Sequence, residues 1–131
     1  MKILVGYDGS NVAKAALKLA RKRAKYFGAQ IEVVKSISQS RKLRYEEIRK
    51  AESDLAHDVM KILDKDFVQK NTHLVVSNHN PGEEIVGFIK NYKIDEIIVG
   101  ATKRTRIGKL LLGSTSQYII LNAPCPVVTI H

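Results

Sequence analysis

Apolar residues occur along this chain in two patterns, as short continuous runs and as stripes that recur every three or four positions. The continuous runs are typical of strands buried on both faces of a parallel sheet, and they cover residues 2–7, 30–37, 73–78, 95–100 and 126–130. The stripes predict helices between these runs, over residues 10–28, 41–66, 80–92 and 114–123. Strand and helix are therefore expected to alternate from one end of the chain to the other.

Polar and small residues mark where the predicted helices begin and end. Ser10 or Asn11 can cap the first helix, and Gly28 can end it. Asn80 can cap the third helix, with Pro81 in the first helical position. The first helix is expected to bury one apolar stripe, made of Ala13, Ala16, Leu17, Ala20, Ala24 and Phe27.

The alternation predicts one α/β domain over residues 1–131, a doubly wound parallel sheet with helices on both faces. Ligands of such sheets bind at the carboxyl ends of the strands, beside the point where the strand order reverses. Three segments are expected at that edge: residues 8–10, residues 36–40 and the chain from Gly100 onward.

The segment after the fourth predicted strand is the first candidate for chemistry. Twelve residues separate Gly100 from Gly113, whereas loops between a strand and a helix usually have about two to six. The run Gly113-Ser114-Thr115-Ser116 then opens a helix, where free N–H groups and the helix dipole favour an anion. The same run is also consistent with a plain turn in which Ser114 caps the helix.

Charged residues near the same edge leave two interpretations open. Asp8 can accept hydrogen bonds from a ribose or hold a hydrated cation, or it can be a turn residue beside Gly9. The basic side chains that follow Gly100 can neutralise phosphates or lie solvated, and they are Lys103, Arg104, Arg106 and Lys109.

Composition favours anionic partners and excludes several other classes. Lys and Arg number 22 against 13 Asp and Glu, for a net charge of +9. The one cysteine, Cys125, cannot form a disulfide within the chain, and no apolar run is long enough for a membrane span. The four histidines are scattered without metal-ligand spacing, and no catalytic or metal-binding residue is assigned. We expect a soluble cytoplasmic protein without a membrane partner.

Four segments together resemble the universal stress protein family over essentially the whole chain. They are the first strand and turn "ILVGYDGS", the helix start "NPGEEIVGFI", the loop "VGATKRTRIGKLLLGSTSQYII" and the ending "NAPCPVVTI". The resemblance implies a five-stranded sheet in the order 3-2-1-4-5 and a homodimer formed through the C-terminal strand. It further implies a stress-response protein that binds ATP or a related nucleotide, with or without Mg²⁺ or Mn²⁺, as a signalling or protective module. Any hydrolysis of ATP is expected to be slow.

Carried over to this sequence, the resemblance places nucleotide-binding residues at the carboxyl edge of the sheet. The implied set is Asp8, Ser36, Gly100, Lys103, Gly113, Ser114, Thr115 and Ser116. Two of these positions depart from the family pattern. Lys103 replaces the second glycine of the loop, where its Cβ can crowd the backbone or its charge can meet a phosphate. Ser36 replaces a valine that packs against adenine in the family, so that wall becomes more polar.

Other function classes fit the sequence differently. A basic binding protein for nucleic acid or an acidic partner would use the loop together with Lys35, Arg41, Lys42 and Arg44. A phosphoacceptor receiver domain is disfavoured, because residues 77–79 at the end of the third strand offer no aspartate. A pyrophosphatase-type synthetase is disfavoured too, because the turn after the first strand lacks that class's glycine-rich loop.

Overall fold

The structure is a computed structural model, and it describes residues 1–39, 42–63, 69–101, 103–104, 108 and 110–131. The described residues form four helices: α1 (Asn11–Phe27), α2 (Tyr45–Leu63), α3 (Pro81–Tyr92) and α4 (Ser114–Asn122). Their strands are β1 (Lys2–Gly6), β2 (Gln30–Ser38), β3 (Lys70–Ser77), β4 (Glu96–Gly100), β5 (Lys103–Arg104), β6 (Leu110–Leu111) and β7 (Val127–Ile130).

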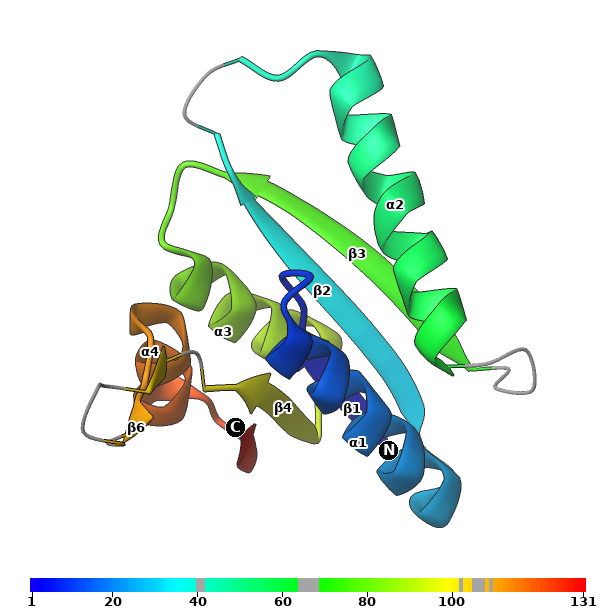
Figure 1. Cartoon of the computed structure of the whole chain (residues 1–131), viewed down its shortest axis with the longest axis vertical. Coiled ribbons are helices and arrows are strands. Elements are labelled where there is room, and N and C mark those ends of the chain that lie inside the picture. The colour runs from blue at the N-terminus through cyan, green and yellow to red at the C-terminus, as the bar shows by residue number, and fades with distance from the viewer. Residues whose placement is uncertain (40–41, 64–68, 102, 105–107, 109) are drawn as a thin grey trace.

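Five strands form one parallel sheet in the order β3-β2-β1-β4-β7. The predicted α/β fold and the strand order 3-2-1-4-5 are therefore confirmed. Strand β1 pairs only with the first part of β2, up to Val34, whereas β3 pairs with β2 as far as Ser38. The β2–β3 pair therefore extends beyond the other strands, as Figure 1 shows.

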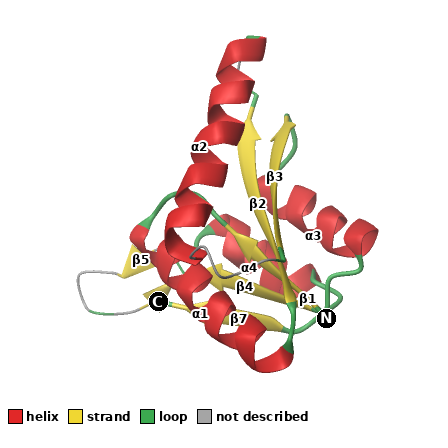
Figure 2. Cartoon of the chain, turned by 90° about the vertical axis from the view of Figure 1, so that its right-hand side faces the viewer, coloured by secondary structure: helices red, strands yellow, loops and turns green. Residues whose placement is uncertain are grey.

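Each face of the sheet packs against its own pair of helices. Alternate residues of β1 point to opposite faces: Ile3 and Val5 join the core under α1 and α2, and Leu4 joins the core under α3. Figure 2 shows α2 and α3 on opposite sides of β2 and β3. Both faces are covered, which explains why the strands read as continuous apolar runs in the sequence.

The helix ends confirm the predicted caps. Ser10 caps α1, with its Oγ accepting a hydrogen bond from the N–H of Ala13, and Gly28 ends α1 at a left-handed φ of 66°. Asn80 caps α3, with its Oδ1 accepting from the N–H of Gly82 at 2.8 Å. The side chains of Ser10 and Asn80 thus accept from N–H groups that lack a partner within the helix.

Several predicted boundaries were wrong. Strand β3 begins at Lys70, three residues early, because the polar Asn71 and His73 pair with a buried carboxylate. Phe27 was expected in the core but is 50% exposed at the last turn of α1. Helix α2 begins at Tyr45, four residues later than predicted, and its predicted continuation over residues 64–66 lies outside the described residues.

The expected long loop after β4 contains a small hairpin. Strands β5 and β6 pair in antiparallel fashion, with Lys103 opposite Leu111 and Arg104 opposite Leu110. Gly108, between them, has a φ of 77°, a value that favours glycine. Short strands of two residues give no readable period, so the sequence could not predict this hairpin.

Candidate functional site

A pocket of about 430 Å³ lies at the carboxyl ends of β1 and β4, between the first turns of α1, α3 and α4. We call it the β1–β4 pocket. Seven of the predicted site residues line it: Asp8, Ser36, Gly100, Gly113, Ser114, Thr115 and Ser116. The fold therefore brings together positions that are up to 108 residues apart in the chain, from 8 to 116.

Asp8 lies in the turn that joins β1 to α1. Its carboxylate Oδ1 accepts a hydrogen bond from the N–H of Ser10 at 2.9 Å, and Gly9 between them has a φ of 84°. Asp8 is thus a turn residue, as one interpretation of the sequence held. The side chain is nevertheless exposed at the pocket, where a carboxylate oxygen can accept a further hydrogen bond from a ligand hydroxyl.

Gly100 is required by packing of the protein against itself. A Cβ built on Gly100 would lie 2.7 Å from Cγ1 and 3.0 Å from Cγ2 of Val12 in the first turn of α1. No real Cβ approaches another carbon so closely, so a side chain here would displace one of the two segments. Gly100 therefore sets how near α1 comes to the end of β4, which shapes the pocket between them.

The first turn of α4 forms the polar wall of the pocket. Gly113 is the N-cap residue, so Ser114 is the first helical residue and does not cap the helix itself. The helical ladder begins with the N–H of Gln117, which donates to the Gly113 carbonyl at 2.9 Å. The N–H groups of Ser114, Thr115 and Ser116 precede it, and no partner for them occurs within the described part of the chain.

The hydroxyl groups of this turn differ in what they can offer. Ser116 is buried, and its Oγ donates to the Gly100 carbonyl at 2.9 Å, so this donor is already used to hold α4 against β4. Thr115 is partly buried and Ser114 is exposed, and both line the pocket. An anion in the pocket would therefore meet two hydroxyls and the N-terminal N–H groups of a nine-residue helix.

The opposite wall of the pocket is apolar. It is formed by side chains of β2, α3, β4 and α4, namely Val34, Ile85, Val99 and Ile119, together with Pro81. Ser36 lies two residues after Val34 on the same face of β2 and is partly buried. The pocket thus combines an apolar side that can take a flat ring with a polar side that can take an anion. Sequence reasoning missed the apolar wall, because its side chains look like ordinary core residues.

Lys103 is the remaining predicted site residue. Its backbone belongs to β5, and Lys93 is the only described non-glycine residue with a positive φ. The position therefore makes no demand for glycine through its backbone angles. Its side chain, like those of Arg104, Arg106 and Lys109, lies outside the described residues.

Tyr7 connects the floor of the pocket to α2. Its hydroxyl donates to Oδ2 of Asp58 at 3.1 Å, and its side chain is buried under α1 and α2. Burial, followed by the hydrogen bond to Asp58 and the charges of Asp58 and Asp8, raises the pKa of Tyr7 to about 12. Tyr7 is thus a neutral donor that fixes α2 to the end of β1, a role that the sequence did not indicate.

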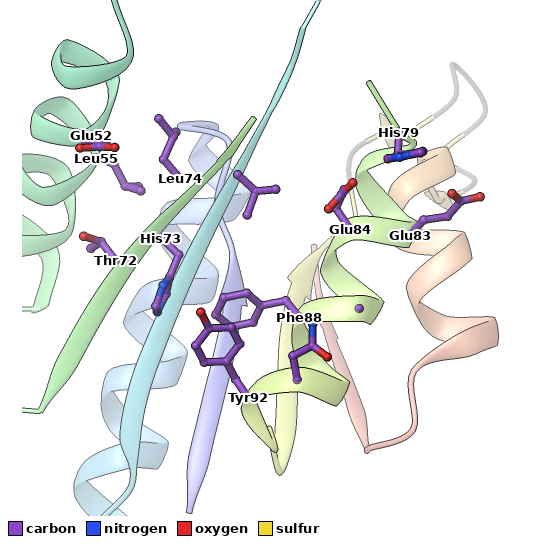
Figure 3. Close-up of a pocket in the computed structure, with 13 residues that line it drawn as sticks. Glu52, Leu55, Thr72, His73, Leu74, His79, Glu83, Glu84, Phe88 and Tyr92 are labelled. Atoms are coloured by element: carbon purple, nitrogen blue, oxygen red, sulfur yellow. The ribbon is translucent and has the colours of Figure 1, made fainter. Parts of the chain in front are cut away.

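A second and larger cavity, of about 830 Å³, runs along the outer edge of β3. We call it the β3 groove. Figure 3 shows Glu52 and Leu55 of α2 on one side of β3, and Phe88 and Tyr92 of α3 on the other. Three carboxylates line this groove, those of Glu52, Glu83 and Glu84. Their negative charge repels a phosphate.

Two titratable side chains of the β3 groove, His73 and Glu84, form hydrogen bonds within the fold. Nε2 of His73 lies 2.7 Å from the buried carboxylate of Glu32, which accepts the hydrogen bond, and the amides of Gln30 and Asn71 donate to the same carboxylate. The His73 ring also packs edge-on against Phe88 at 4.7 Å. Glu84 accepts a short hydrogen bond from the hydroxyl of Ser77.

Other predicted features have mixed outcomes. Arg44, expected in a basic surface, forms an ion pair with Glu47 at 3.2 Å, and Arg41 lies outside the described residues. Cys125 is partly buried, and burial, followed by the charges of Glu96 and Asp95, raises the pKa of its thiol.

Within the described ranges, no cluster of three or more acidic, His or Cys side chains could hold a metal ion. No helix in that part of the chain is long and apolar enough to cross a membrane.

Comparisons with solved structures place this geometry among known proteins. The chain matches a universal stress protein from Archaeoglobus fulgidus with 31% identity and a TM-score of 0.84, covering 100% of this chain and 98% of that one. A structure of the universal stress protein from Archaeoglobus fulgidus in complex with dAMP matches with 28% identity and a TM-score of 0.78, covering 100% and 98%. The protein UspA from Lactobacillus plantarum matches with 25% identity and a TM-score of 0.75, covering 100% and 97%.

Family-level comparison covers the whole chain. A search of curated protein sequences found no match. The model of the universal stress protein family matches residues 1–131. The four sequence segments that resemble the family lie within this span, and the observed strand order is the one that the resemblance implied. The chain therefore belongs to the universal stress protein family.

Proposed function

We propose that the β1–β4 pocket binds ATP or a related adenine nucleotide, and that the protein acts in the stress response as a nucleotide-dependent signalling or protective module. One observation carries the proposal. The same pocket joins an apolar wall to the open N-terminus of α4 and an exposed carboxylate, which together complement a base, a phosphate and a sugar.

Each part of the pocket has a distinct task in this proposal. The base packs between Val34 and Ile85, with Ser36 offering a polar contact at the rim. The carboxylate of Asp8 accepts from a ribose hydroxyl while it keeps its turn with Ser10. Phosphate oxygens accept from the N–H groups at the start of α4 and from the hydroxyl of Thr115.

The loop after β4 and a metal ion complete the proposed site. Lys103, on β5, supplies a positive charge to the outer phosphates of ATP. Mg²⁺ or Mn²⁺ would enter with the triphosphate, held by phosphate oxygens and water with Asp8 nearby, since such ions keep much of their hydration. No residue is assigned a catalytic role, and any hydrolysis is expected to be slow. A dAMP complex of a relative with 28% identity supports an adenine nucleotide as the ligand class.

A charge placed in the anion wall tests the proposal. Thr115→Asp introduces a carboxylate at the second position of α4, where an acidic residue favours the helix but repels phosphate. Calorimetry should show that ATP affinity falls by about tenfold or more, or 1.4 kcal/mol, while adenosine affinity changes little. Thr115→Asn, of the same size and uncharged, is the matched control. Absence of ATP binding by the wild type at millimolar ATP with Mg²⁺ would refute the proposal.

Dimerisation and location complete the proposed function. Strand β7 forms the edge of the sheet opposite β3, and within the described residues its outer side pairs with no strand. We expect two copies to associate through this strand in a cytoplasmic homodimer. Thr129 is exposed on β7, so Thr129→Pro should leave the core intact and reduce dimer mass in light scattering. A wild-type protein that is monomeric at high micromolar concentration contradicts this expectation.

A further inference from the structure

A third cavity, of about 520 Å³, lies between α1 and α2 and is almost entirely basic. It is lined by Lys18, Arg21, Lys22, Lys25 and Lys61 with the single apolar residue Ile62. We call it the α1–α2 basic groove. No carboxylate is among these lining residues, so the groove concentrates positive charge on one surface of the molecule.

The spacing along α1 places three of these lysines on one face. Lys18, Lys22 and Lys25 follow one another at four and three positions, and each is exposed. From Lys18 to Lys25 the helix rises about 10 Å, a length along which a stacked strand presents about three phosphates. The groove is therefore matched in length to a short stretch of nucleic-acid backbone.

In the part of the chain that the structure describes, the four lysines of the groove form no ion pair with an acidic side chain. Helix α1 contains no acidic residue, and Glu96, which comes from β4, is engaged by Arg23 through two bonds of 2.6 Å apart from the groove. On α2, Asp58 is one turn before Lys61, but it accepts the hydroxyl hydrogen of Tyr7. Asp64 and Asp66, which follow α2, lie outside the described residues.

Exposed aromatic rings stand at the end of the same helix. Tyr26 is 84% exposed and follows Lys22 by four positions, which puts it on the lysine face. Phe27 is 50% exposed, and its ring packs edge-on against Tyr26 at 4.9 Å. Aromatic side chains so open to water beside cations are the combination on which unpaired bases stack.

We propose that the α1–α2 basic groove binds single-stranded nucleic acid without sequence preference, with its lysines on the phosphates and Tyr26 stacking on a base. This surface is separate from the β1–β4 pocket. Val12 and Ala13 of α1 line that pocket, whereas Lys25 lies about 20 Å farther along the helix. The proposal therefore does not depend on nucleotide binding in the pocket.

Fluorescence anisotropy with a labelled 20-nucleotide uridine RNA tests the proposal. Affinity should fall as salt rises from 50 to 200 mM, with a slope of about −3 in log–log form for about four phosphate contacts, one for each lysine. Lys18→Glu with Lys22→Glu should weaken binding by about tenfold or more. The control Lys50→Glu with Lys90→Glu changes the net charge equally, at exposed positions outside the groove, and should change affinity by less than about threefold.

Three further measurements distinguish single-stranded nucleic acid from other anionic ligands of the groove. Tyr26→Ala should weaken RNA binding by about fivefold or more and leave the salt slope unchanged. Saturating ATP should not displace the RNA, and a duplex of the same length should bind more weakly than the single strand. The proposal is overturned if the RNA does not bind at 50 mM salt, or if the control variant loses as much affinity as the groove variant. It is also overturned if heparin binding shows the same variant pattern and Tyr26→Ala has no effect, because the groove would then be a general polyanion surface.

Discussion

The β1–β4 pocket and the β3 groove are both cavities at the margin of the same sheet, but their chemistry is opposite. The groove is about twice as large, at about 830 Å³ against about 430 Å³. It is lined by carboxylates, and Glu32, His73 and Ser77 around it already have partners. The pocket is lined by glycines, by hydroxyls and by N–H groups at the start of a helix.

The two cavities also differ in which polar groups remain available to a ligand. In the groove, His73 and Glu84 already form hydrogen bonds within the fold, and the contacts of Glu84 with Ser77 and of His73 with Phe88 hold α3 against β3. Polar groups of the pocket arise where helices begin after parallel strands, and several stay available because a helix cannot pair its own first N–H groups. Availability of donors, more than volume, therefore distinguishes the pocket as the candidate site.

Removing the buried carboxylate should give the largest effect and should separate the two regions. Glu32→Ala leaves His73, Gln30 and Asn71 without their common partner, and urea unfolding should show a loss of about 3 kcal/mol. ATP affinity of the folded protein should stay within about twofold, because Glu32 does not line the pocket. A loss below about 1 kcal/mol would mean that this network contributes little to the fold.

A side chain at Gly100 should affect both the fold and the pocket. In Gly100→Ala the new Cβ meets Val12, and stability should fall by about 1–3 kcal/mol. Displacement of α1 should also weaken ATP binding by about fivefold, or 1 kcal/mol. Adding Val12→Ala removes the two closest carbons and should restore part of both losses. Unfolding and calorimetry on the single and double variants check this, and no recovery in the double variant contradicts the packing explanation.

Asp8 tests the polar side of the pocket. Asp8→Ala removes the carboxylate that faces the sugar, and ATP affinity should fall about tenfold, or 1.4 kcal/mol. The same change also removes the bond to the N–H of Ser10, so Asp8→Asn, which keeps that acceptor, is the control for the turn. If calorimetry finds the affinity of Asp8→Ala unchanged, the role of Asp8 is confined to the turn.

The smallest effect is expected from a glycine in the β3 groove. Gly87 is helical, lines the groove, and a Cβ there would meet nothing within 4 Å. Gly87→Ala should therefore raise the free energy of unfolding by about 0.5–1 kcal/mol, through a lower backbone entropy of the unfolded chain. ATP affinity should not change. A clear fall in ATP affinity would move the nucleotide toward the groove.

The sequence predicted the main sheet and the polar side of the pocket because local rules govern both. Continuous apolar runs require a covered parallel sheet, and Ser10, Gly28 and Asn80 mark helix ends by their own chemistry. Parallel topology then brings distant strand ends together, so Asp8 and Gly113 could be placed at one edge.

What the sequence could not predict depends on contacts between distant segments. Lys70 and Asn71 read as a loop, because the partner that draws Asn71 into β3 is Glu32, 39 positions away. Gly100 was expected to serve a ligand, whereas the atom that excludes its Cβ belongs to Val12. The basic groove was not predicted either, because it forms only where the lysines of α1 meet Lys61 of α2.

Amide chemical shifts during titration with ATP and Mg²⁺ test the central claim most directly, since they report which cavity the nucleotide enters. In a two-dimensional ¹H–¹⁵N spectrum of the wild-type protein, the largest shifts should occur at Gly113, Ser114 and Thr115, with smaller shifts at Asp8 and Gly100. Signals from the β3 groove should remain in place. Saturable shifts centred on His73, Gly87 and Tyr92, with the start of α4 unchanged, would contradict the claim that the nucleotide binds in the β1–β4 pocket.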